Sequence, residues 1–160
     1  MEEDAEQTHI RVLAGTASSG RPVFEVLPAR RLGEECEVHG SPGLAYGFAA
    51  GDRIRLRSDG TFEVVARDGN LCLRLYPSTR PVDGNIEALK AAFARLRGLV
   101  EMPSDRRFIV ITVPVSAGFP AVEKAVSYWA AEQECTWEFG NVYDENDDVL
   151  DWVAELGLSP

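Results

Sequence analysis

The fold is decided by residues 47–77, GFAAGDRIRLRSDGTFEVVARDGNLCLRLYP, which predict three consecutive β-strands. Charged and apolar residues alternate from Arg53 to Arg57, as they do in a strand with one buried face. The Asp-Gly pair within residues 58–61 suits the tight turn of a hairpin. Because Asp52 follows a glycine, we expect its side chain to cap the turn that leads into the first strand.

The other two strands of this segment are expected over residues 62–66 and 71–76, with a second turn between them. In the third strand the leucines should be buried and Arg74 exposed. Pro77 should end that strand, because proline cannot donate a hydrogen bond to the ladder. The segment therefore predicts an antiparallel meander with one side in solvent.

The solvent side of this meander would carry Arg53, Arg55, Arg57 and Arg74 around Glu63. One interpretation is a binding site for an anion or a small anionic molecule. The other is a solvated face held by cross-strand ion pairs. The second is favoured, because Glu63 lies among the arginines and no aromatic residue interleaves them as a base-stacking surface would require.

The rest of the chain divides around this meander into four parts. Residues 1–8 predict an acidic flexible terminus, and residues 9–76 a β-rich lobe of about six short strands. That lobe would form a barrel-like or strongly bent antiparallel sheet. Residues 77–143 predict an α/β lobe that shares the strand 71–76 with the first lobe, and residues 144–160 an acidic C-terminal helix.

The α/β lobe is predicted from a change in hydrophobic period. Apolar residues recur at helical spacing from Ile86 to Val100, and a second helix should begin with Pro120 in its first position. Apolar strands are expected at residues 108–113 and 136–142. The order strand, helix, strand, helix, strand is typical of a ferredoxin-like split βαβ layer with two helices. The predicted fold class is therefore α+β.

Charge is distributed unevenly along the 160 residues, whose net charge is −10. The segments 1–8 and 132–160 hold half of the 26 acidic residues and no lysine or arginine, so all 16 basic residues lie between them. Acidic ends predict no binding of nucleic acid there, because like charges repel. They favour a basic protein partner instead. No apolar run approaches the ~20 residues of a membrane helix, so no membrane partner is expected.

The cysteines and the amino terminus predict a cytoplasmic protein. Cys36, Cys72 and Cys135 are odd in number and far apart, which argues against a disulfide framework. The first residues are acidic and lack the apolar segment of a signal peptide. No metal-ligand spacing, phosphate loop, dinucleotide fingerprint or serine elbow occurs, so neither a metal nor a cofactor is expected.

An enzyme would need a pocket that joins Glu25, His39 or Cys72 within hydrogen-bond reach, and nothing in their spacing requires this. We favour the simpler interpretation, in which Glu25 is an exposed or arginine-paired strand residue and Cys72 a buried apolar one. Trp152 remains open: an aromatic residue among acids is a common anchor at interfaces, but it can equally pack on the body of the protein.

Residues 24–76 resemble a bacterial family of uncharacterised proteins, the domain of unknown function DUF4265. The resemblance rests on three places: Glu25–Ala29, where that family shows a glutamate followed by leucine, tryptophan and alanine; residues 47–54; and residues 64–74. Pro28 stands where the family has tryptophan. The resemblance implies no established activity. Relatives that occur near toxins make an immunity role the natural analogy.

These observations predict a non-enzymatic protein-binding module, of the kind that an immunity or antitoxin-like inhibitor would be. The expected partner is a basic protein, for example a toxin, that binds the acidic C-terminal surface. Its contact residues would be Asp144, Glu145, Asp147, Asp148, Asp151 and Trp152. The alternatives are a small-molecule or anion-binding module that uses Arg53, Arg55, Arg57 and Arg74, or a small tailoring enzyme.

Overall fold

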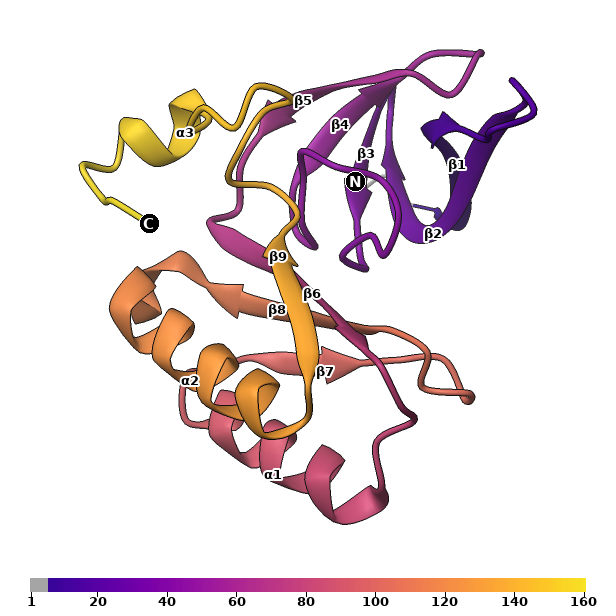
Figure 1. Cartoon of the computed structure of the whole chain (residues 1–160). Coiled ribbons are helices and arrows are strands. Elements are labelled where there is room, and N and C mark those ends of the chain that lie inside the picture. Colours follow the sequence, from indigo (N-terminus) through magenta and orange to yellow (C-terminus); the bar gives the residue numbers. More distant parts are fainter. Residues whose placement is uncertain (1–5) are drawn as a thin grey trace.

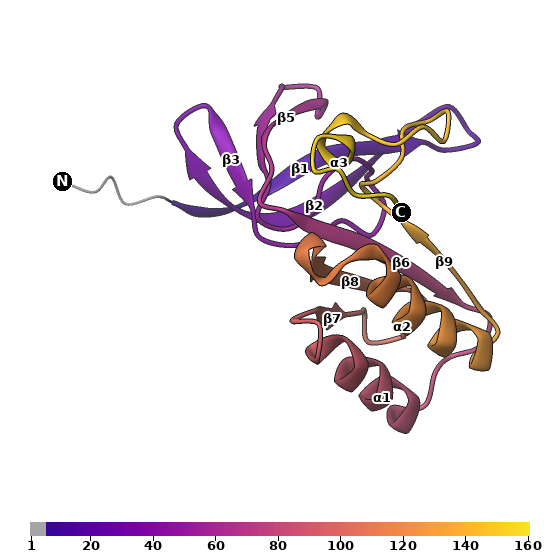
Figure 2. The same cartoon turned by 90° about the vertical axis from the view of Figure 1, so that its left-hand side faces the viewer.

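The computed structural model describes residues 6–160 and contains two antiparallel sheets with few helices (Figure 1). The α+β class is confirmed. In both views the helices α1 (Asp83–Ala94) and α2 (Phe119–Glu132) lie side by side on one face of the second sheet (Figure 2). The first sheet occupies the opposite end of the molecule.

The first sheet is a bent, open meander. Its strands follow one another in space as they do in the chain: β1 (Gln7–Thr16), β2 (Pro22–Leu32), β3 (Glu35–Val38), β4 (Arg53–Leu56) and β5 (Phe62–Ala66). Within residues 6–160 it does not close into a barrel, since β1 and β5 remain its two edges. Its core contains Val12, Ala29, Val38, Phe48 and Ile54, all fully buried.

The prediction of a three-stranded meander is correct for β4 and β5 and wrong for the third strand. β4 pairs with β5 in antiparallel register, with Ile54 opposite Val64. The chain then leaves this sheet, and β6 (Asn70–Pro77) lies between β8 and β9 in the second sheet. The prediction that Arg74 is exposed is therefore also wrong: its side chain has 0% exposure, because β6 is covered on both faces.

The second sheet has the order β7 (Leu99–Glu101), β8 (Ile109–Pro114), β6, β9 (Cys135–Phe139), and every neighbouring pair is antiparallel. β7 was not predicted from the sequence, because it occupies only three residues between Gly98 and Pro103. A short 3₁₀ turn, η1 (Val115–Ala117), connects β8 to α2. Pro120 lies in the first turn of α2, but as its second residue and not its first as predicted, because the helix begins at Phe119.

Helix packing completes the second core. Ile86, Leu89 and Phe93 of α1 and Val122 and Val126 of α2 are buried against the sheet. Apolar residues at this spacing form one stripe along each helix. The described residues contain no helix that is long and apolar enough to cross a membrane.

The C-terminal helix is shorter than predicted. α3 (Asp151–Ala154) is a single turn, preceded by a loop that Tyr143 and Val149 close with a β-bridge. Asp147 in this loop has φ of 62°, which no α-helix accommodates. Val153 is fully buried and belongs to the second core, so the segment is docked on the protein. Of the predicted flexible terminus, residues 1–5 lie outside the described residues, whereas Gln7 and Thr8 already belong to β1.

Candidate functional site

The loop between β3 and β4 is held to the rest of the protein by the carboxylate of Glu25. The backbone N–H of Gly43 donates to one oxygen at 2.7 Å, and those of Leu44 and Ala45 donate to the other at 3.0 and 2.9 Å. Glu25 was expected to be exposed or paired with an arginine. Instead it is half-buried and accepts hydrogen bonds from backbone N–H groups. The carboxylate fixes the residues that lead to Tyr46.

Beneath Tyr46 lies the guanidinium of Arg74. Its central carbon is 3.9 Å from the centroid of the Tyr46 ring, and its Nη1 donates to the carbonyl of Ala45 at 2.9 Å. Its Nε lies 3.5 Å from Oε1 of Glu138. Nε and Nη2 are buried without a hydrogen-bond partner among the described residues. The charge of Arg74 is therefore balanced mainly by one carboxylate and one aromatic face.

Glu138 also accepts two phenol hydroxyls. Tyr46 donates to its Oε1 at 2.7 Å and Tyr76 donates to the same oxygen at 2.8 Å. Burial raises the pKa of both tyrosines, and the hydrogen bond to Glu138 raises it further, because an ionised phenol could not donate. Tyr46, Tyr76 and Arg74 thus fix Glu138 at the junction of the two sheets.

Two neighbouring cavities, of about 320 and 620 Å³, open on the outer side of Tyr46. Both are lined by Tyr46, Glu138, Tyr143, Asp144 and Asp147, and we call the two cavities together the acidic groove. The smaller cavity adds Glu123, Trp137 and Phe139, and the larger adds Gly47, Glu145 and Leu150. No lysine, arginine or histidine of the described chain lines either cavity. The groove therefore combines carboxylates with aromatic surface.

The acidic loop forms the outer wall of this groove. Oδ1 of Asp144 accepts the backbone N–H of Asn146 at 2.8 Å and that of Asp148 at 3.0 Å, which shapes the loop. Asp144, Glu145 and Asp147 are exposed, and none lies within ion-pair distance of a base in residues 6–160. The structure thus brings three of the six predicted contact residues together in the groove.

The other three predicted contact residues lie outside the groove lining. Asp148 and Asp151 are exposed nearby. Trp152 is half-buried against the second core; its indole N–H donates to the carbonyl of Asn141 at 2.8 Å, and Arg67 lies 5.3 Å from its ring centroid. These contacts fit the interpretation in which Trp152 packs on the body of the protein.

The predicted arginine face is divided in the structure. Arg53 and Arg55 approach Glu35 at 3.5 and 3.4 Å, and Arg55 and Arg57 approach Glu63 at 3.6 and 3.8 Å. Arg74 lies elsewhere, in the buried site under Tyr46. Cross-strand pairing with glutamates therefore accounts for the exposed arginines of β4.

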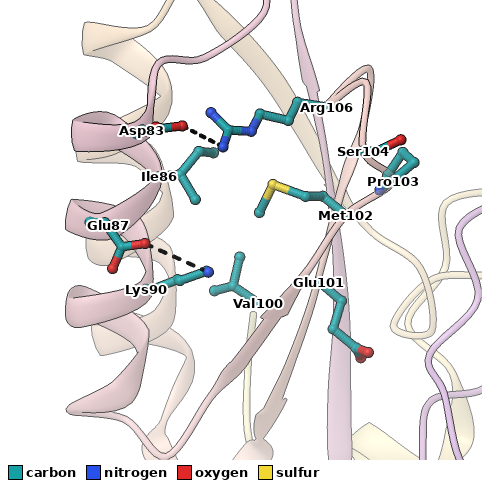
Figure 3. Close-up of a pocket in the computed structure, with 10 residues that line it drawn as sticks. All are labelled: Asp83, Ile86, Glu87, Lys90, Val100, Glu101, Met102, Pro103, Ser104 and Arg106. Atoms are coloured by element: carbon teal, nitrogen blue, oxygen red, sulfur yellow. Dashed lines mark ion pairs between the residues drawn. The ribbon is translucent and has the colours of Figure 1, made fainter.

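A further cavity, of about 790 Å³, lies between α1 and β7 (Figure 3). Ile86, Val100 and Met102 point into it, and Arg106 reaches across its upper end to Asp83. A second ion pair, Glu87 to Lys90 at 3.7 Å, lies on the α1 side. Most of its charges are already paired with one another, so this cavity offers a ligand less than the acidic groove does.

Of the residues proposed for an enzyme, Glu25 and His39 line one cavity of about 270 Å³, and Cys72 is not among its lining residues. Nε2 of His39 contacts Oε1 of Glu37 at 3.0 Å, and Glu25 is occupied by three backbone donors. Burial raises the pKa of the Cys72 thiol to about 12, which disfavours the thiolate that a nucleophile requires. As predicted, Asp52 caps a turn: it accepts the N–H of Ala49 at 2.9 Å.

Tyr46, Tyr143 and Glu138 are the groove residues that sequence reasoning missed. Tyr46 and Glu138 are hydrogen-bonded although 92 positions separate them. Neither belongs to a motif, and Tyr46 lies in a loop without hydrophobic period. The acidic run of the C-terminal segment was the one local signal for this site, and it identified the outer wall alone.

A family model and a solved structure of similar fold match this chain, and the description of neither states a function. The family model described as Domain of unknown function (DUF4265) matches residues 25–139. A solved structure described as "Novel crystal structure of a hypothetical protein from Neisseria gonorrhoeae" is similar in fold, with a TM-score of 0.66 and 11% sequence identity. The similarity covers 86% of this chain and 96% of that one. No curated protein matches the sequence.

Proposed function

The chain belongs to the DUF4265 family, and from this premise we propose that it is a non-enzymatic module whose acidic groove binds a basic segment of a partner protein. The observation that carries the proposal is the pair of adjoining cavities, which share Tyr46, Glu138, Tyr143, Asp144 and Asp147 and are lined by no basic residue of the described chain. Such a surface favours a lysine or arginine side chain.

The chemistry of the groove supports a cationic side chain in two ways. Asp144 and Asp147 can accept charge-assisted hydrogen bonds from an incoming ammonium or guanidinium group. Tyr143 and Trp137 offer ring faces, and a cation over such a face gains about 0.5–2 kcal/mol. The carboxylates of the groove and its rim would also speed the encounter with a basic surface.

We propose further that the protein is an immunity-type inhibitor in the cytoplasm, where a basic toxin would be its partner. The family analogy motivates this role, and the free thiols of Cys36, Cys72 and Cys135 fit a reducing compartment.

We also propose that β6–β9 with α1 and α2 form a ferredoxin-like layer. The element order β6, α1, β7, β8, α2, β9 and the strand order β7-β8-β6-β9 support that assignment.

Charge reversal in the groove tests the binding role. Asp144→Lys and Asp147→Lys would be compared with Glu132→Lys, an exposed acid at the far end of α2 that lines neither cavity. Tagged variants would be used to purify partners from the native host. The expected partner is a basic protein that the wild type and the Glu132→Lys variant retain and both groove variants lose.

The rate of association gives the second measurement. Lowering the ionic strength from about 0.1 M to about 0.01 M lengthens the Debye length from about 10 Å to about 30 Å. The association rate constant of the wild type should rise, and that of the groove variants should rise less. A partner that binds the groove variants as tightly as the wild type would reject the groove as the interface. Unchanged toxin resistance in a deletion strain would reject the immunity role.

A further inference from the structure

A second charged cavity, of opposite sign, lies in the first sheet and has a volume of about 340 Å³. Ile10, Cys36 and Leu56 provide its apolar lining. Its polar lining consists of His9, Arg11, Arg31, Glu34, Arg57 and Ser58, which we call the arginine cavity. None of these residues lines the acidic groove. The two sites are therefore separate.

The cavity is built by close contact between β1 and the turn that joins β4 to β5. The backbone N–H of Leu13 donates to the carbonyl of Gly60 at 2.8 Å. Gly60 has φ of 88°, and a Cβ there would approach the Phe24 ring to 2.8 Å, so glycine permits this contact. The guanidinium carbon of Arg11 lies 4.0 Å from the centroid of the same Phe24 ring. Arg11 of β1 and Arg57 of the turn after β4 thus line one cavity.

The arginines of this cavity are poorly balanced by acids. Among residues 6–160, Glu34 is the one carboxylate that lines the cavity, so its three arginines carry a surplus of two positive charges over the described lining. Among residues 6–160, Arg11 and Arg31 form no ion pair, and Arg57 has one loose pair with Glu63 at 3.8 Å. Arg55 on the neighbouring face pairs with both Glu35 and Glu63. Uncompensated like charges around one cavity repel one another, and a bound anion removes that repulsion.

We propose that the arginine cavity binds a phosphate group, either free or as an ester on a small molecule. A phosphate dianion matches the surplus of two charges, and guanidinium groups donate to phosphate oxygens in a bidentate geometry. The Ser58 hydroxyl at the rim adds a donor. The site differs from the arginine face expected from the sequence, with which it shares Arg57 alone. It also does not depend on the proposed function of the acidic groove.

Titration calorimetry of the full chain at low salt tests this site, with inorganic phosphate, pyrophosphate and phenyl phosphate as probes. The variants Arg11→Gln and Arg31→Gln should each weaken binding about tenfold, as expected for one charge-assisted hydrogen bond. Arg55→Gln is the matched control, because this arginine is exposed on the same sheet but pairs with glutamates. It should bind like the wild type. Preference for phenyl phosphate would identify an ester ligand, and preference for inorganic phosphate a free one.

Three outcomes would overturn the proposal. One is the absence of a heat of binding at millimolar concentrations of all three probes. Another is binding that Arg55→Gln weakens as much as Arg11→Gln does, which would place the anion near Arg55 and outside the cavity. The third is binding that neither cavity variant changes. Thermal denaturation of each variant without ligand shows whether it is folded, so a loss of binding cannot be confused with a loss of structure.

Discussion

Replacing Glu138 by glutamine should destabilise the protein by leaving Arg74 with a buried, unbalanced charge. Glu138 is the carboxylate within ion-pair distance of this guanidinium, at 3.5 Å. Glutamine has the same shape and keeps an oxygen that can accept the hydroxyls of Tyr46 and Tyr76. The substitution therefore removes the charge and little else. Because Arg74 has no exposed surface, water cannot replace the lost carboxylate.

The magnitude follows from the burial of the two partners. Removing one member of a buried ion pair costs about 3–5 kcal/mol. Here the Glu138 side chain is 36% exposed, so solvent already weakens the pair, and we expect the lower end, about 3 kcal/mol. For a chain of this length the melting temperature should fall by about 6–12 °C. Arg74→Met with Glu138→Gln removes both charges and should return to within about 1 kcal/mol of the wild type.

Urea unfolding followed by tryptophan fluorescence measures these differences, with Glu132→Gln as an exposed control that should change little. The wild type, Glu138→Gln, Arg74→Met and the variant with both substitutions form a double-mutant cycle. A loss below about 1 kcal/mol for Glu138→Gln would refute the reasoning. So would a double variant as unstable as Glu138→Gln, because the instability would then come from packing and not from the charge.

Two further predictions concern the same junction. Because burial and Glu138 raise the pKa of Tyr46 and Tyr76 above 10.0, absorbance titration should show two tyrosines that ionise above the ordinary range. These phenols keep their protons in the folded state when the unfolded chain has lost them, so the free energy of unfolding should fall as the pH rises above about 10. Glu25→Gln should lower the free energy of unfolding by about 1–3 kcal/mol. The NH₂ group of the glutamine cannot accept a hydrogen bond, so a backbone N–H of the loop loses its acceptor. Urea unfolding checks this, with the exposed Glu63→Gln as the control.

The parts of the fold that the sequence predicted correctly are those with a clear hydrophobic period. Alternation from Arg53 to Arg57 and helical spacing after Ile86 both report one buried face, and the structure has β4 and α1 there. β6 shows why this reasoning fails for a central strand. Leu73 and Leu75 are buried by the helices, but Cys72 and Arg74 are buried too, by the loop that carries Ala45 and Ala49. An alternating pattern predicts that an arginine is exposed, so a buried arginine leads to a wrong prediction.

The candidate site was predictable to a smaller extent, because it depends on contacts between distant parts of the chain. Clustered acids identified Asp144, Glu145 and Asp147 before the structure. The inner wall consists of Tyr46 and Glu138, which the folding of a loop onto β9 brings together. Nothing in the local sequence around either residue reports that contact. The arginine cavity is similar, since Arg11 and Arg31 come from β1 and β2, outside residues 47–77.

Local charge, and not net charge, decides what each surface can bind. A net charge of −10 predicts attraction to basic partners at long range. At contact distance, however, only groups within about a Debye length matter, which is about 8 Å at physiological ionic strength. We therefore expect the acidic groove to attract cations through Asp144 and Asp147, and the arginine cavity to attract anions although the whole chain is acidic. Since the sites share no residue, Asp144→Lys should leave phosphate binding unchanged and Arg11→Gln should leave partner binding unchanged.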